Sequence, residues 1–250
     1  IMLTKVIKRH ILEHAQEEYP RECCGVIVEG KYYACRNIAP NGDGEAQLHP
    51  DDFREFEGRI EAFVHSHPDG TSKASQADLV QMEYFEIPYI ICGYPNSDFS
   101  VYVPTGYRAP LIGRKFFHGV LDCFTLVRDF YERELSIVIP DFERQDRWWE
   151  NSDNPSLYMD NFEAAGFVQI PMEELRYGDS IIAKVGDTEH PNHAMVYLGS
   201  QGNLKSEENP AVQGNSIILH HLYGRKSNRE VFGEMWLAKS VAAVRHKDLL

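Results

Sequence analysis

Two groups of residues have side-chain types and spacings that could do chemistry, and the first resembles a metal site. His65 and His67 lie two apart in the run HSHP, and Ser75 and Asp78 follow in the run SQAD. Imidazoles two residues apart on a strand project from the same face, so both can reach one ion. Asp78, at the start of the next predicted helix, can supply a third ligand. Three protein ligands leave a fourth position for water, which is the arrangement of a catalytic zinc site.

Each fragment also has a structural interpretation. Ser75 and Asp78 have the spacing of a helix capping box, and two histidines can alternate on a strand by chance. Two imidazoles and one carboxylate suit several divalent ions, so zinc is predicted from the ligand types alone.

The second group is centred on Cys123, which follows Asp122 at the start of a predicted amphipathic helix. The helix dipole and the unpaired N–H groups of a first turn favour the nucleophilic thiolate. Such a nucleophile requires a base, and the base requires a third polar group to orient it. His193 begins one predicted strand and His220 ends another. His221 remains the rival of His220, because a shift of one residue reverses the face of a strand.

Size and composition limit the possible classes of protein. The chain has 250 residues, enough for two small domains that each bury a core. A net charge of −13 without a Lys/Arg-dense stripe argues against nucleic-acid binding by phosphate neutralisation. We find no apolar run near the length of a membrane span and expect no signal peptide. Five irregularly spaced cysteines do not form the pattern of a disulfide framework, and they indicate assembly in a reducing cytoplasm.

The first half of the chain is predicted to alternate helices and strands. Helical periodicity predicts helices over 5–18 (capped by Thr4), 51–60 and 75–86, and turn residues and β-branched runs predict strands over 23–28, 32–36, 62–65, 88–92 and 99–103.

A stretch with two prolines and two glycines, residues 104–113, separates the two halves. We therefore predict a domain over 1–105, a linker over 106–113 and a second domain over 114–250. The second domain is predicted to begin with a helix over 122–135, followed by strands over 180–185, 194–198, 217–220 and 241–245. Helices first and strands later indicate an α+β class.

Taken together, the fragments of the first group match His-x-His-x7-Ser-x-x-Asp without a gap. This resembles the motif of the JAMM (MPN-type) metallopeptidases, and Glu22, followed by Cys-Cys-Gly, resembles the family's upstream strand. The resemblance implies that His65, His67 and Asp78 bind Zn²⁺. It further implies that Glu22 is the general acid/base and that Ser75 donates to the tetrahedral intermediate.

The second half resembles the NlpC/P60 cysteine peptidases, which have a papain-like core and cut peptide stems of the bacterial cell wall. The similar features are Asp-Cys on a helix, Tyr-Gly-Asp over 177–179 and His-Ala-x-x-Tyr-Leu-Gly over 193–199. The resemblance implies Cys123 as nucleophile, His193 as base and His220 as the orienting residue. The chain departs from many members in having Phe-Thr rather than Ser-Gly after the cysteine. The tandem tryptophans at 148–149 line a cleft, pack in the core or make an interdomain contact.

The order of the two domains resembles the tail-tip assembly proteins of lambda-like siphophages. That resemblance implies a bifunctional peptidase that cuts peptidoglycan stem peptides with its cysteine and a peptide or isopeptide bond with its zinc. It also implies synthesis in the host cytoplasm, a place at the virion tail tip beside other tail-tip proteins, and action at the cell wall.

Two alternatives belong to other classes. The chain could be a virion assembly factor whose two folds act mainly as binding modules. It could also be a cellular deubiquitinase-like enzyme, which cleavage of ubiquitin chains would reveal.

Overall fold

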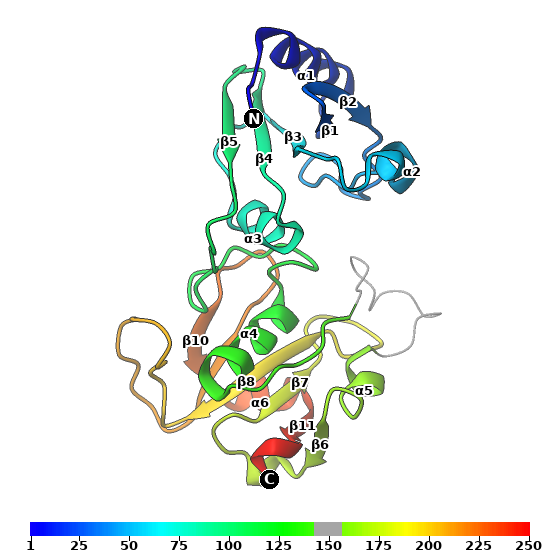
Figure 1. Ribbon diagram of the computed structural model, residues 1–250. Coiled ribbons are helices and arrows are strands. Elements are labelled where there is room, and N and C mark those ends of the chain that lie inside the picture. Colours follow the sequence, from blue (N-terminus) through cyan, green and yellow to red (C-terminus); the bar gives the residue numbers. More distant parts are fainter. Residues whose placement is uncertain (143–156) are drawn as a thin grey trace. The chain divides into compact units, whose positions relative to one another are not determined.

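The chain folds into two units, residues 1–108 and 109–250, and each has its own sheet (Figure 1). The computed structural model describes residues 1–142 and 157–250, so the tandem tryptophans lie outside the described residues. Among the described helices, none combines the length and the apolar character needed to cross a membrane. The predicted class, α+β with two domains, is confirmed.

The first unit is built on a five-stranded sheet in the order β2-β1-β3-β4-β5. Its strands are β1 (Cys24–Val28), β2 (Lys31–Cys35), β3 (Ala62–Pro68), β4 (Tyr89–Tyr94) and β5 (Phe99–Tyr102). Its helical segments are α1 (Lys5–Glu18), α2 (Pro50–Phe53), the 3-10 turn η1 (Arg54–Phe56) and α3 (Gln76–Phe85). β3 and β4 are parallel, and α3 provides the crossover that a parallel pair requires.

Helix α1 begins and ends as its sequence predicts. The Thr4 hydroxyl accepts a hydrogen bond from the N–H of Ile7 at 3.2 Å, which satisfies one unpaired donor of the first turn. Ile7, Ile11 and Ala15 are buried, and the first two pack with apolar residues of β1, β3 and β4. The helix therefore covers one face of the sheet.

The helix predicted over 51–60 is wrong in extent. α2 has four residues and continues as the three-residue η1. Phe56 is buried, but it packs from the 3-10 turn against the face of the sheet opposite α1. Gly58 then adopts a left-handed φ of 78°, which an α-helix cannot contain.

The second unit is built on a six-stranded antiparallel sheet in the order β10-β9-β8-β7-β11-β6. Its strands are β6 (Phe167–Ile170), β7 (Ser180–Ala183), β8 (His193–Gly199), β9 (Ile217–His220), β10 (Asn228–Val231) and β11 (Ser240–His246). Its helical segments are α4 (Cys123–Leu135), α5 (Leu157–Asn161), α6 (Glu234–Lys239) and the 3-10 turns η3 (Met172–Glu174) and η4 (Lys247–Leu249).

The two faces of this sheet are covered by different helices. α4 packs on one face, where Leu126, Val127 and Phe130 join the larger apolar cluster (Figure 1). On the other face, Trp236 of α6 is buried with Ile218 of β9. The predicted helix and four predicted strands are present, whereas β6 and β10 were not predicted.

A buried ion pair ties the sheet of the second unit together. Arg245 of β11 donates from Nε and from NH2 to the two carboxylate oxygens of Asp179, at 2.8 and 2.9 Å. Asp179 is fully buried, and its other partner is the N–H of Arg176. The hydroxyl of Tyr131, on α4, donates to the carbonyl of the adjacent Gly178. The Gly-Asp pair of the predicted motif is therefore where the helix and two strands are joined.

We expect Asp179→Asn to lower the free energy of unfolding of the second unit by about 3 kcal/mol, because it leaves the guanidinium of Arg245 without its buried counter-charge. Tryptophan fluorescence during urea titration would measure it, since all three tryptophans lie in residues 109–250. Asp187→Asn, on an exposed loop, is the matched control. Equal midpoints for the two variants would contradict the assigned role of the pair.

Candidate functional sites

The first candidate site is a triangle of side chains from β3 and α3. The Nε2 atoms of His65 and His67 lie 3.2 Å apart. Asp78 faces both rings, with Oδ1 3.1 Å from Nε2 of His65 and Oδ2 3.3 Å from Nε2 of His67. The structure thus brings together the three residues that the motif predicts as metal ligands.

The triangle has the dimensions of a zinc site. Zinc bonds of about 2.0–2.1 Å to imidazole and carboxylate, in tetrahedral geometry, separate neighbouring ligand atoms by roughly 3.3 Å. The three distances in the triangle agree with that edge length. The donor set of two nitrogens and one oxygen also fits a zinc ion that keeps one position open.

The orientation of two of the three candidate ligands is fixed by a second contact. Nδ1 of His67 donates to the carbonyl of Thr71 at 2.8 Å, which leaves the Nε2 lone pair directed at the centre of the triangle. Asp78 belongs to a complete capping box: Ser75 Oγ accepts its N–H at 3.0 Å, and its Oδ2 accepts the N–H of Ser75 at 2.8 Å. Asp78 therefore caps α3 and faces both histidines at the same time.

Charge makes the triangle favourable for a cation. Burial alone would lower the pKa of His65, but the nearby carboxylates of Asp78 and Glu22 raise it to about 9. Burial would likewise raise the pKa of Asp78, but both histidines and the N–H of Ser75 hold it well below its usual range. Without a metal ion, a proton on the His65 ring therefore balances the Asp78 carboxylate, and a cation can replace that proton.

Glu22 lies beside the triangle, two residues before the start of β1. Its side chain is buried, and burial raises its pKa to about 7 against the opposing effect of His65 and His67. Asn37 holds the Glu22 backbone by donating from Nδ2 to its carbonyl at 3.0 Å. A carboxyl group that changes protonation near neutral pH suits a general acid/base.

Strand β1 can carry Glu22 to this position only with glycine near its start. A Cβ on Gly25 would lie 2.4 Å from the carbonyl oxygen of Tyr33 and equally close to the ring of Tyr32. Cys23 and Cys24, between Glu22 and this glycine, are fully buried in the sheet. Ser75 is exposed, and because its oxygen acts as acceptor in the capping box, its hydroxyl hydrogen can still be donated.

The second candidate site begins at the first residue of α4. Asp122 caps the helix by accepting the N–H of Thr125 at 2.9 Å, and Thr125 Oγ1 accepts the N–H of Asp122 in return. The residue that replaces glycine in the motif therefore completes a capping box. Cys123 is 6% exposed, and its Sγ lies 4.0 Å from the carbonyl oxygen of Asn192, which precedes His193.

The structure brings His193 and His220 together and places His221 elsewhere. Nε2 of His193 lies 2.9 Å from Nδ1 of His220, and both rings are buried. His221 follows the last residue of β9, and its Nε2 donates to the carbonyl of Arg225 at 2.9 Å. Burial, with the neighbouring histidines, lowers the pKa of His193 well below its ordinary value, so this ring is neutral at neutral pH.

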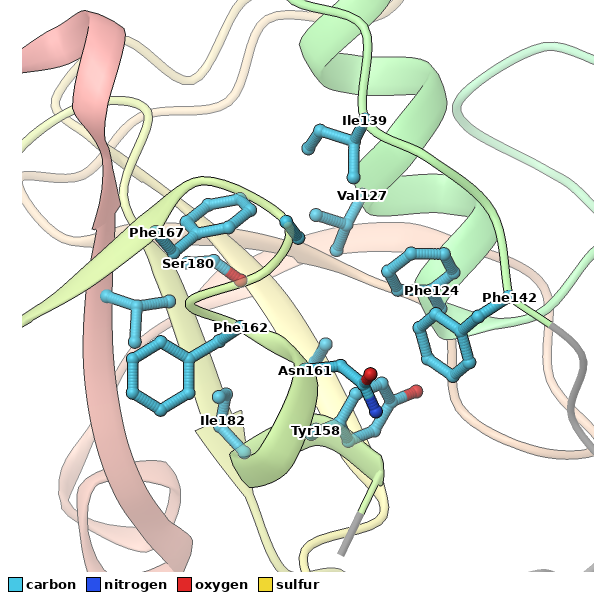
Figure 2. A pocket seen from close by; sticks show the side chains of 13 residues that line it. Phe124, Val127, Ile139, Phe142, Tyr158, Asn161, Phe162, Phe167, Ser180 and Ile182 are labelled. Carbon is cyan, nitrogen blue, oxygen red and sulfur yellow. The ribbon is translucent and has the colours of Figure 1, made fainter.

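An apolar cavity lies beside Phe124, the residue that follows the candidate nucleophile Cys123 (Figure 2). Phe124 and Phe142 form one wall, with ring centroids 4.5 Å apart, and Tyr158 and Asn161 of α5, with Ser180 of β7, bring the polar atoms. Its volume of about 50 Å³ is far below the roughly 150 Å³ that holds a benzene ring. Phe124, which stands where many family members have serine, makes this wall apolar.

Sequence reasoning missed several residues that complete the sites. The hydroxyl of Tyr158 lies 3.0 Å from Sγ of Cys123, and Thr71 and Asn37 orient groups of the first site. These contacts join residues 4, 15 and 35 positions apart. No local pattern in the sequence marks them.

Two family comparisons agree with the two units. Prok-JAB, the prokaryotic homologs of the JAB domain, matches residues 4–103, and the NlpC/P60 family matches residues 113–245. These matches define a two-domain protein with folds of the JAB and NlpC/P60 classes.

Two relatives narrow the assignment. Tail tip assembly protein K of Escherichia phage N15 is 34% identical over 247 residues, covering 96% of this chain and 93% of the relative. Tail tip assembly protein K of Escherichia phage lambda is 35% identical over 203 residues, covering 80% and 89%. The chain therefore belongs to the NlpC/P60 family and, within it, to the family of tail tip assembly protein K, as its motifs predict.

A solved structure of the JAMM metalloprotease-like zinc site in the proteasome and signalosome is 23% identical over 42% of this chain and 89% of its own length. Its TM-score is 0.28, a value at which the likeness carries no argument about this chain.

We expect the affinity of the metal-free protein for Zn²⁺ to increase as the pH rises toward 9. Zinc can bind only when Nε2 of His65 gives up its proton, and the pKa of that ring is about 9. Glu22 ionises near pH 7 and adds negative charge over the same range. Calorimetric titration in buffers of different ionisation enthalpy would measure both affinity and protons released.

His65→Ala should bind no zinc in this titration, and His10→Ala, an exposed histidine on α1, should behave as the wild type. An affinity that does not change between pH 7 and pH 9 would contradict the assignment of His65 as a proton-exchanging ligand.

Proposed function

We propose that this protein is a two-site peptidase of a phage tail tip. The observation that carries the proposal is the buried His193–His220 pair, 2.9 Å apart, at the strand end that Cys123 also reaches. The cysteine site would cleave stem peptides of peptidoglycan. The site around His65, His67 and Asp78 would cleave a peptide or isopeptide bond in a tail protein or wall crossbridge.

At the cysteine site, the sulfur of Cys123 would attack a stem-peptide carbonyl carbon. Its proton passes to the ring nitrogen of His193 that does not face His220, which is Nδ1. The C–N bond then breaks, and His193 returns that proton to the leaving amine. Water hydrolyses the resulting thioester, and His193 again serves as the base.

At the first site, His65, His67 and Asp78 would hold the zinc. A bound zinc would act as a Lewis acid on the scissile carbonyl and favour ionisation of a water molecule. Glu22, which titrates near neutral pH, would accept a proton from the attacking water and deliver it to the leaving amine. The exposed hydroxyl of Ser75 would donate to the oxyanion of the tetrahedral intermediate.

The names of the relatives support a place at the tail tip, in contact with other tail proteins. A protein made in the host cytoplasm and carried in the virion would meet peptidoglycan from outside during genome entry. The net charge of −13 gives no support to nucleic acid as a partner.

A second candidate function is assembly alone, with both folds acting as binding modules. One observation favours it: the proposed nucleophile is 6% exposed and lies against the Tyr158 hydroxyl, so a substrate carbonyl must displace or share that contact. The two candidates differ in whether purified protein cuts anything.

We expect Cys123→Ala to abolish cleavage of purified peptidoglycan, because no other group in the described cysteine site can form the thioester. Mass spectrometry of released fragments would identify the bond cut by the wild type. Retention of cleavage by Cys123→Ala would contradict the thiol mechanism. An intact, zinc-loaded wild type that releases nothing would favour assembly alone.

We expect Glu22→Gln to lower cleavage at the zinc site by about 100-fold or more, because the amide cannot accept a proton from water. Peptide and isopeptide crossbridge substrates, analysed by mass spectrometry, would measure it. Glu22→Gln should keep its zinc and the full wall-cleaving activity of Cys123. Cys123→Ala and Glu22→Gln are therefore controls for each other. Full turnover by Glu22→Gln would contradict its proposed role.

A further inference from the structure

The cysteine site extends past His220 to a glutamate on the edge strand. Nε2 of His220 is buried and, among the described residues, has no partner in hydrogen-bond geometry. Glu230 of β10 brings its Oε1 to 3.5 Å from this nitrogen. In the β9–β10 register, Asn228 pairs with His220 and Glu230 pairs with Ile218, so Glu230 lies diagonally across from His220 on the same face.

A tryptophan holds this carboxylate in place. Nε1 of Trp236 donates to Oε1 of Glu230. The Trp236 ring is 4% exposed and packs against both imidazoles, with centroids 4.8 Å from His220 and 5.9 Å from His193. Trp236 thus shields the histidine pair from water and fixes the carboxylate beside it.

The hydrogen positions follow from these contacts. If Nδ1 of His193 is to accept the proton of Cys123, its Nε2 must carry the ring hydrogen and donate it to Nδ1 of His220. His220 must then carry its own hydrogen on Nε2, the atom that faces Glu230. The opposite tautomer of His220 would place two N–H groups against each other.

We propose that Glu230 is a positioning residue of the cysteine site, which accepts the Nε2 hydrogen of His220 and so keeps His193 in the tautomer that can take a proton from Cys123. This role rests on the proposed cysteine peptidase function. At 3.5 Å the contact is longer than a closed hydrogen bond, as contacts within a catalytic site often are before substrate binds.

Glu230 also supplies the counter-charge that the pair requires when His193 becomes protonated. Burial disfavours the imidazolium at both rings, and Glu230 opposes that effect at His220. Among the described residues, Arg225 and His221 are the other groups that act on the charge of the pair, and neither favours a positive charge there. Without the Glu230 carboxylate, the thiolate–imidazolium pair should be less populated at neutral pH, and the Cys123 thiolate should form only at higher pH.

Alkylation of the thiol tests this role without any substrate. The rate of reaction of the Cys123 peptide with iodoacetamide would be measured against pH by mass spectrometry, which separates it from the four other cysteines. For Glu230→Gln we expect an alkylation rate about tenfold lower at pH 7 and a profile displaced to higher pH. We also expect wall cleavage with kcat/KM about 10- to 100-fold lower and little change in KM.

Glu234→Gln, an exposed glutamate of α6 with the same change of charge, is the matched control and should behave as the wild type. Trp236→Phe keeps a ring beside the histidines but removes the N–H that holds Glu230, so it should shift the alkylation profile in the same direction by a smaller amount. Circular dichroism would establish that each variant is folded.

The outcomes separate this role from the proposed function. Alkylation profiles that coincide for Glu230→Gln and Glu234→Gln would overturn the positioning role, whatever the wall digestion gives. A wild type that cuts no wall peptide, while alkylation still responds to His193→Ala and to Glu230→Gln, would overturn the peptidase function and support the role of Glu230.

Discussion

Both sites are built at a helix N-terminus, where unpaired backbone N–H groups must be satisfied before any side chain can be positioned. In each case a capping box does this. Asp78 closes the box with Ser75 and faces two histidines with the same carboxylate. Asp122 closes the box with Thr125 and thereby fixes the backbone of Cys123. A local interaction of the first helical turn therefore sets the geometry of each site, and the sheets add the histidines.

The two sites give buried histidines opposite properties. His65 lies against a carboxylate, so its pKa is raised and it holds a proton that a cation can replace. Among the described residues, no carboxylate raises the pKa of His193, and burial together with the neighbouring imidazole of His220 lowers it. In the proposed function, the same residue type would thus serve as a ligand that exchanges its proton in one unit and as a neutral proton acceptor in the other. Both rings are buried, and the opposite directions of their pKa shifts follow from the position of the nearest carboxylate.

The elements that could be predicted from the sequence are those set by interactions between neighbouring residues, such as helix caps and turns. The Thr4 cap marked the start of α1, and the turn at Glu29–Gly30, with φ of 50° and 70°, marked the β1–β2 hairpin. Strand β10 was not predicted, because NREV carries a single β-branched residue at an exposed edge. The ligand triangle could be predicted from spacing, and Glu22 only from the family resemblance. The contacts of Tyr158 and Glu230 depend on tertiary packing and leave no pattern in the sequence.

The sharing of Asp78 between a helix cap and a ligand triangle couples the folding of the first unit to occupancy of its site. The three ligand side chains come from one strand and one helix, and an unfolded chain cannot hold them within 4.8 Å of one another. A cation bound there would consequently stabilise the native first unit by mass action, and its removal would weaken the start of α3 together with the site. The thermal midpoint of a cation-loaded first unit would therefore fall when a chelator is added.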